Sequence, residues 1–367
     1  MKSLLRILFV CMLGIATCHA SELKNLRVNR MLEPKGIVRM GQFSWQIESE
    51  ENDIRQLAYR IKVASTSEGL QGGPALMWDS ERRESTDMIQ IFYQGRRFPY
   101  QSTVYWQLEV WLSNDEYLKS PIQRIQTGQK GSEWNGDPVS KNDVRHDYFY
   151  YLRWLHSLQM NQTDNGELLL PVPDDSLAIP LDRTAAVLYS LYKEEGDLKS
   201  LYDYYNMVKR WTMFQCRIDS TLSSQMINMM TEMAQKMNLQ ADVLEYRRLH
   251  SDSTTYEPYW LYTEEPKWCG GVIRQTPSSI AYNRVDITIP SPRVNYKESF
   301  SHECPYGTIC SEWSKDENGI ISWEIQLPVG VQARVLYPKG YADNEGGHSA
   351  IVGSGGWIFR LLPEVTD

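Results

Sequence analysis

The sequence has few of the features that mark metal sites and nucleic-acid surfaces. None of its 6 cysteines forms a Cys-x-x-Cys pair, and its 6 histidines are scattered, so the ligand spacing of a zinc site is missing. Its 38 basic residues are outnumbered by 46 acidic ones, giving a formal net charge of −8, which argues against a phosphate-binding surface. It also has no Gly-rich phosphate loop and no nucleophile beside a base. We therefore expect no cofactor, no metal and no nucleic-acid partner.

Long apolar runs are confined to the N-terminus. A basic start over residues 1–6 precedes an apolar stretch over 7–17, and the small residue Ala20 ends it. This pattern predicts a signal peptide over residues 1–20. No later stretch reaches the roughly 20 apolar residues that cross a bilayer. We therefore predict a secreted or periplasmic protein without a membrane span. The alternative is an N-terminal lipid anchor at Cys18.

Cys304 and Cys310 flank a short loop between expected strands. An oxidising compartment would permit a disulfide bond between them. The alternative is two unpaired thiols on neighbouring strands, and the sequence alone supports both interpretations equally.

Hydrophobic periodicity divides the 367 residues into three regions. Residues 24–128 alternate apolar and polar side chains, as in Phe43, Trp45 and Ile47, and predict an antiparallel β-sandwich whose tryptophans pack in the core. Residues 133–283 change to helical spacing. Residues 284–363 return to short strands separated by turns, and predict a second β-sandwich. The predicted fold class is thus a multidomain α and β protein in the order β, α, β.

Five helices are expected in the middle region. Their ranges are about 142–158, 181–195, 197–211, 220–237 and 241–250. Gly196 is expected to end the second helix and Asp197 to cap the third. The stripe formed by Met226, Met230 and Met233 is typical of core packing rather than of a ligand groove.

Both β-regions resemble domains of one family. Residues 43–45 (Phe-Ser-Trp) and 76–80 (Leu-Met-Trp-Asp-Ser) are similar to the N-terminal fibronectin type III-like domain of bacterial α-L-rhamnosidases. Residues 305–309 (Pro-Tyr-Gly-Thr-Ile) and 311–313 (Ser-Glu-Trp) resemble the C-terminal β-sandwich of the same enzymes. The resemblance implies an exported, carbohydrate-active protein whose partner is a rhamnose-containing glycan.

The middle region resembles only part of the family's catalytic (α/α)6 barrel. Residues 164–166 (Asp-Asn-Gly) and 172–174 (Val-Pro-Asp) follow the barrel in order. A complete barrel has about twelve helices and needs well over about 200 residues, which residues 133–283 do not supply. We therefore predict a partial α/α-toroid that packs directly on both β-domains. Its remaining exposed helical face could form a homodimer.

The catalytic motif is altered as well. The family inverts at the anomeric carbon, and this needs a protonated acid and an opposed carboxylate base. Its acid lies in a Glu-Arg-x-Gly-Trp-x-Gly-Asp stretch, whereas this chain has Glu133 directly before Trp134 and keeps Asp137 at the end. Glu133 and Asp137 are the catalytic candidates that remain, and the family's base has no counterpart. By the same resemblance, Trp134, Asp174 and Asp182 are candidates for substrate binding, although near helix starts such acids often cap or face solvent.

The residues thus leave two hypotheses. The chain is linked to the hydrolysis of terminal α-L-rhamnose from glycans, with impaired catalysis. Alternatively, it is a non-catalytic pseudoenzyme that binds or scaffolds rhamnoglycans, since a shared fold does not transmit activity.

Overall fold

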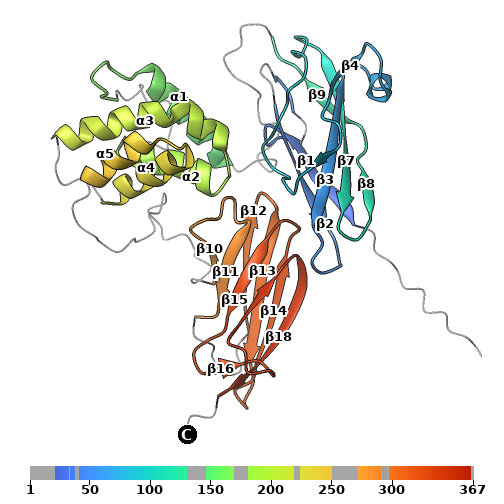
Figure 1. Cartoon of the computed structure of the whole chain (residues 1–367), viewed down its shortest axis with the longest axis vertical. Coiled ribbons are helices and arrows are strands. Elements are labelled where there is room, and N and C mark those ends of the chain that lie inside the picture. Colours follow the sequence, from blue (N-terminus) through green and yellow to red (C-terminus); the bar gives the residue numbers. More distant parts are fainter. Residues whose placement is uncertain are drawn as a thin grey trace, which may run out of the picture.

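The computed structural model of the chain has three units in the order β, α, β (Figure 1). It describes residues 21–32, 34–37, 41–129, 146–168, 181–218, 224–249, 272–290, 292, 294 and 297–364. We call the units the N-terminal sandwich, the helical unit and the C-terminal sandwich. The predicted fold class is confirmed.

The N-terminal sandwich consists of two antiparallel sheets. One has the order β1-β2-β6, and the other follows the path β4-β3-β7-β8, with β5 on β3 and β9 on β7. The strands are β1 Glu22–Val28, β2 Gln42–Glu48, β3 Gln56–Ala64, β4 Leu76–Asp79, β5 Arg83–Glu84, β6 Ile91–Phe92, β7 Thr103–Leu112, β8 Tyr117–Lys119 and β9 Gln123–Gln126. The predicted alternation is confirmed, because Phe43, Trp45 and Ile47 are buried. The rings of Phe43 and Trp106, one from each sheet, lie with centroids 4.8 Å apart.

The helical unit contains five α-helices within its described residues, as predicted. They are α1 His146–Met160, α2 Thr184–Lys193, α3 Leu198–Ile218, α4 Ser224–Lys236 and α5 Gln240–Leu249. The methionine stripe of α4 is core, because Met226, Met230 and Met233 are all buried. Among the described residues, no helix is long and apolar enough to cross a membrane.

The C-terminal sandwich also consists of two sheets. Their orders are β10-β11-β15-β17 and β12-β13-β14-β18-β16. The strands are β10 Ile273–Gln275, β11 Arg284–Thr288, β12 Lys297–Cys304, β13 Gly307–Lys315, β14 Ile321–Leu327, β15 Gln332–Leu336, β16 Tyr341–Ala342, β17 Ser349–Val352 and β18 Gly355–Pro363. Pairing is antiparallel except for β11 with β15. Trp313 and Trp323 are buried between the layers.

No disulfide bond joins Cys304 and Cys310, which are both described residues. The hairpin of β12 and β13 places Cys304 opposite Gly307 and Cys310 opposite Ser301. Side chains alternate between the two faces of a strand, and directly opposed residues share a face. The two cysteines therefore point to opposite faces of the sheet. Of the two interpretations of the sequence, the structure shows the one with two thiols on neighbouring strands.

The two sandwiches contact one another directly. The Asn52 amide donates to the backbone oxygen of Gly356 and accepts from its backbone nitrogen, both at 2.9 Å. Asp53 N donates to Ser354 O at 2.8 Å, and Ser354 Oγ donates to Ile54 O at 2.7 Å. Between them, Gly355 has a φ of +107°, and a Cβ there would overlap Asn52 Oδ1. This contact, which we call the inter-sandwich contact, therefore requires glycine at position 355.

The helical unit packs on both sandwiches, as predicted. Leu198 N, at the start of α3, donates to Gln90 Oε1 of the N-terminal sandwich at 3.1 Å. On the other side, Ala281 N donates to Lys193 O at 2.9 Å, and Lys193 Nζ donates to Pro277 O at 2.6 Å. A homodimer through an exposed helical face stays a prediction.

Candidate functional site

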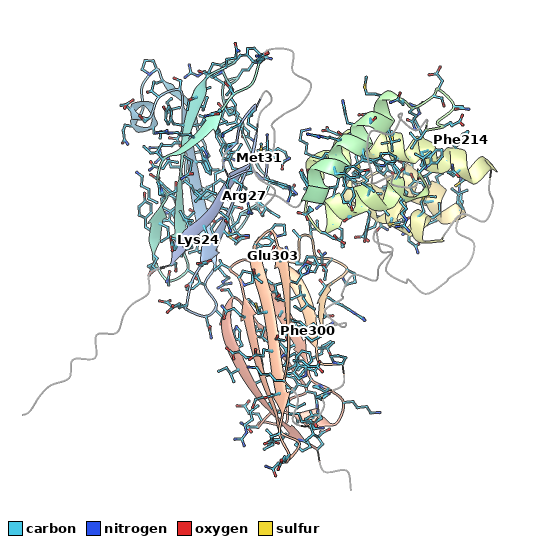
Figure 2. All side chains as sticks on the ribbon, turned by 180° about the vertical axis from the view of Figure 1, so that it is seen from behind. Lys24, Arg27, Met31, Phe214, Phe300 and Glu303 are labelled. Atoms are coloured by element: carbon cyan, nitrogen blue, oxygen red, sulfur yellow. The ribbon has the colours of Figure 1, made fainter. Side chains whose placement is uncertain are left out.

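A cavity of about 340 Å³ lies where the three units meet, and we call it the junction cavity. Its polar lining residues come from all three units and are Asn25, Arg27, Arg30, Gln42, Ser44, Gln46, Gln90, Tyr148, Glu195, Glu303 and Thr308. Figure 2 shows Glu303 at the near end of the C-terminal sandwich and Arg27 on the edge of the N-terminal sandwich that faces the helical unit. The lining is rich in amide, carboxylate and guanidinium groups, so the cavity suits a polar ligand.

The alternation along β2 places one wall of the cavity. Phe43, Trp45 and Ile47 point into the core, so the intervening Gln42, Ser44 and Gln46 face the other way. All three of these polar residues line the cavity.

Gln46 also connects the two sandwiches beside the cavity. Its Nε2 donates to Pro305 O at 3.0 Å, and its Oε1 accepts from Asn25 Nδ2 at 2.6 Å. This amide is therefore held in place by one group from each sandwich.

Arg30 connects the N-terminal sandwich to the helical unit. It follows β1 in a turn where Asn29 and Arg30 both have positive φ. Its Nη1 donates to Glu195 Oε2 at 2.9 Å, and its Nη2 bonds to the Glu195 carbonyl oxygen. Its guanidinium also lies 4.5 Å from the ring centroid of Tyr148. Burial alone would lower the pKa of Arg30, but Tyr148, Glu195 and Asp197 outweigh it and raise that pKa.

Tyr148 and Asp197 continue this network into the helices. Tyr148 Oη donates to Asp197 Oδ2 at 2.5 Å. Asp197 also accepts from Ser200 N at 3.1 Å and from Ser200 Oγ at 2.6 Å, which confirms it as the cap of α3. Burial, and then the Asp197 charge, raise the pKa of Tyr148 well above its usual value. Tyr148 is therefore a neutral hydrogen-bond donor at physiological pH.

Two carboxylates line the cavity from different units, Glu195 from the helical unit and Glu303 from β12. Inverting hydrolysis needs one protonated acid and one carboxylate that activates water. Arg30 binds both the side chain and the carbonyl of Glu195. The Glu195 carboxylate therefore already has a structural role, which is to fix the turn between α2 and α3. The arrangement favours hydrogen bonding to a polar ligand over cleavage of a bond.

Most candidates from the sequence lie outside the described residues. This is true of Glu133, Trp134, Asp137 and Asp174. Asp182 lies in a short 3-10 helix, Leu181–Arg183, but its side chain is outside the description. The catalytic and substrate-binding roles of these residues stay predictions.

Sequence reasoning missed the residues of the junction cavity. Arg30 and Glu195 are 165 positions apart, and Gln46 and Pro305 are 259 apart. The sequence offers only local hints of the cavity residues. Strand alternation places Gln46 on the polar face of β2, and the Gly196-Asp197 pair marks a helix boundary next to Glu195.

Two family models match this chain, one in each sandwich. Residues 23–130 match the model described as the Rha78A-like, N-terminal immunoglobulin domain. Residues 281–351 match the bacterial alpha-L-rhamnosidase C-terminal domain. Immunoglobulin and fibronectin type III domains share the sandwich architecture, so the first match agrees with the predicted fold.

Curated relatives resemble the chain over somewhat more than a quarter of its length. An alpha-L-rhamnosidase of Formosa agariphila is 35% identical over 108 residues, which are 28% of this chain and 12% of that protein. An alpha-L-rhamnosidase of Alteromonas sp. (strain LOR) is 30% identical over 105 residues, 28% of this chain and 11% of that protein. The chain thus covers only about a tenth of the length of these relatives.

Solved structures resemble the chain over nearly its whole length. The alpha-L-rhamnosidase from Dictyoglumus thermophilum has a TM-score of 0.71 at 9% identity, covering 93% of this chain and 99% of that chain. The enzyme from Aspergillus terreus has a TM-score of 0.65 at 8% identity, again covering 93% and 99%. At such low identity these likenesses show the fold alone.

Proposed function

We propose that this alpha-L-rhamnosidase-like protein binds rhamnose-containing glycans in the junction cavity, and that hydrolysis is weak or lost. The observation that carries the proposal is the polar lining contributed by three units. The similarity of both sandwiches to domains of alpha-L-rhamnosidases supports rhamnose as the sugar.

The size and chemistry of the cavity support a small saccharide as ligand. Its volume of about 340 Å³ lies within the range of about 300–1,000 Å³ that is usual for small-molecule sites. Carboxylates, amides and guanidinium groups can each bond to sugar hydroxyls. The Tyr148 ring is only 7% exposed, so we expect recognition through hydrogen bonds rather than through stacking on that ring.

Weak hydrolysis is supported by the helical unit. Its described residues form five α-helices, compared with about twelve in a complete ring of six helical hairpins. The altered motif around Glu133 and the engagement of Glu195 by Arg30 point in the same direction. Hydrolysis by Glu195 and Glu303 is the second candidate function, because both carboxylates line one cavity.

Isothermal titration with L-rhamnose and methyl α-L-rhamnoside tests binding, and an aryl α-L-rhamnoside tests turnover. We expect saturable binding that Glu303→Gln weakens, with turnover close to the buffer rate. Glu324→Gln is the matched control, since Glu324 is exposed on β14 and does not line the cavity. Absence of binding in the unchanged protein would refute the proposal. Turnover that both Glu195→Gln and Glu303→Gln abolish would instead establish the hydrolase.

We also propose export, because residues 1–20 have the pattern of a signal peptide. Mass spectrometry of the protein from its native host gives the N-terminus. A mature chain that begins at Ser21 supports secretion or a periplasmic location, and an acylated Cys18 supports the lipid anchor. A chain that retains Met1 contradicts export.

A further inference from the structure

Two aromatic rings lie side by side on the outer face of the N-terminal sandwich. Trp111 of β7 and Tyr117 of β8 are directly opposed in the antiparallel pair, with ring centroids 5.4 Å apart. Val110 and Leu112 point into the core, so the alternation of β7 turns Trp111 outward. Tyr117 remains 49% exposed, although a ring of this size is usually covered when it serves the core alone.

Charged side chains surround this pair. The Arg82 guanidinium lies 4.7 Å from the Trp111 ring centroid and also pairs with Glu84 at 3.0 Å. On the other side, Glu109 is 3.4 Å from Lys119. The half-exposed Arg82 and the exposed Lys119 can therefore reach a ligand resting on the rings.

We propose that Trp111, Tyr117 and Arg82 form a second saccharide site, which takes pyranose units of a polysaccharide chain. The C–H face of a pyranose can pack on an aromatic ring, while its hydroxyls bond to charged groups at the rim. A stable protein partner would need about 800 Å² of surface on each side. The half-exposed Tyr117 and its neighbour Trp111 offer instead an area suited to one or two sugar units.

The site is separate from the junction cavity. None of its three residues lines that cavity, and β7 and β8 lie on the side of the N-terminal sandwich away from the helices (Figure 1). The inference therefore goes beyond the proposed function, and each can fail without the other.

Affinity gel electrophoresis tests the site with rhamnogalacturonan, xyloglucan and arabinoxylan cast separately into native gels. We expect at least one polysaccharide to retard the unchanged protein, and Tyr117→Ala to weaken that retardation about fivefold, as expected for one aromatic contact. Trp111→Ala and Arg82→Ala should weaken it too. Tyr202→Ala is the matched control, since Tyr202 of α3 is 56% exposed, and it should behave like the unchanged protein.

Two outcomes would overturn the inference. One is that none of the three polysaccharides retards the unchanged protein. The other is that Tyr117→Ala, confirmed as folded by circular dichroism, migrates like the unchanged protein in every gel. Titration of the Tyr117→Ala protein with L-rhamnose separates the two sites, because binding in the junction cavity should be unchanged.

Discussion

Arg30 is the residue through which the N-terminal sandwich holds the helical unit. It and Glu195 are only 18% and 14% exposed. Removing one partner of such a pair leaves the other charge without compensation, which in a fully buried setting costs about 3–5 kcal/mol. The remaining exposure reduces this, so we expect Arg30→Met to lower the free energy of unfolding by about 2–3 kcal/mol in urea titration.

The control is Lys199→Met, which removes an exposed pair with Asp203 on α3. Exposed pairs of this kind contribute about 0.5 kcal/mol or less. Equal losses in the two variants would show that the Arg30 bridge does not stabilise the protein.

Asp79 gives the stability a defined pH dependence. Arg60 donates to both of its carboxylate oxygens, at 2.9 and 2.7 Å. These bonds, helped by the backbone N–H of Glu81, outweigh burial and lower the pKa of Asp79. A carboxyl whose pKa is lower in the folded state stabilises the protein fully above its unfolded pKa, about 3.9, and loses this as the pH falls through the folded value.

We therefore expect the difference in unfolding free energy between the unchanged protein and Asp79→Asn to be constant from about pH 7 to 5 and to shrink below about pH 4. Urea titrations across this range measure it. In an Arg60→Gln background the pH-dependent part should shrink to the smaller share that the backbone N–H of Glu81 supports. A difference that grows on acidification would contradict the assigned direction.

At the scale of the element, α3 begins at a buried cap. Asp197 is 1% exposed and serves both the first turn of the helix and the Tyr148 hydroxyl. Loss of a cap costs about 1 kcal/mol, and an unsatisfied buried hydroxyl costs about 1–3 kcal/mol. We expect Asp197→Ala to destabilise by about 2–4 kcal/mol and Asp197→Asn, which keeps an acceptor, by less. Urea titration of both variants checks this, and equal stability of all three proteins would exclude the dual role.

Elements were more predictable from the sequence than the site was. Alternation and helical spacing identified β2, β7 and the five helices because burial imposes these periods locally. The third helix was expected to end at Trp211 but continues to Ile218, since no glycine or proline interrupts that stretch. The junction cavity depends on contacts such as Arg30 with Glu195, which no local period encodes.

The pairing of Cys304 and Cys310 was equally hard to predict from the sequence. Their spacing in the sequence was compatible with a disulfide bond, but the faces they occupy depend on the register of β12 and β13. That register places the hairpin turn at Pro305 and Tyr306, which puts the two thiols on opposite faces.

At the scale of the whole molecule, the three units share interfaces and should unfold together. Calorimetry should show one transition, with van't Hoff and calorimetric enthalpies in agreement. Well-separated transitions would mean that the units are independent, contrary to the contacts made by Asn52, Arg30 and Lys193.

A substitution at Gly355 tests the inter-sandwich contact directly. Gly355→Ala combines a positive φ with an overlap at Asn52, and we expect a loss of at least about 2 kcal/mol. Gly340→Ala is the control, because Gly340 also has positive φ but nothing within 4 Å, and it should lose only the backbone cost of about 1–2 kcal/mol. Calorimetry compares the two. Equal melting temperatures would show that the Asn52 contact tolerates a methyl group.

The hydrogen bonds between residues 52–54 and 353–356 join positions about 300 residues apart. These hydrogen bonds close a loop that contains nearly all of the intervening chain, including the helical unit. The entropy of closing a chain grows only with the logarithm of its length, so each doubling adds about 0.6 kcal/mol. Helical hairpins can therefore be inserted or deleted within this loop with little change in the free energy of forming the inter-sandwich contact. Paired sandwiches of this kind can accommodate helical inserts of very different size during evolution.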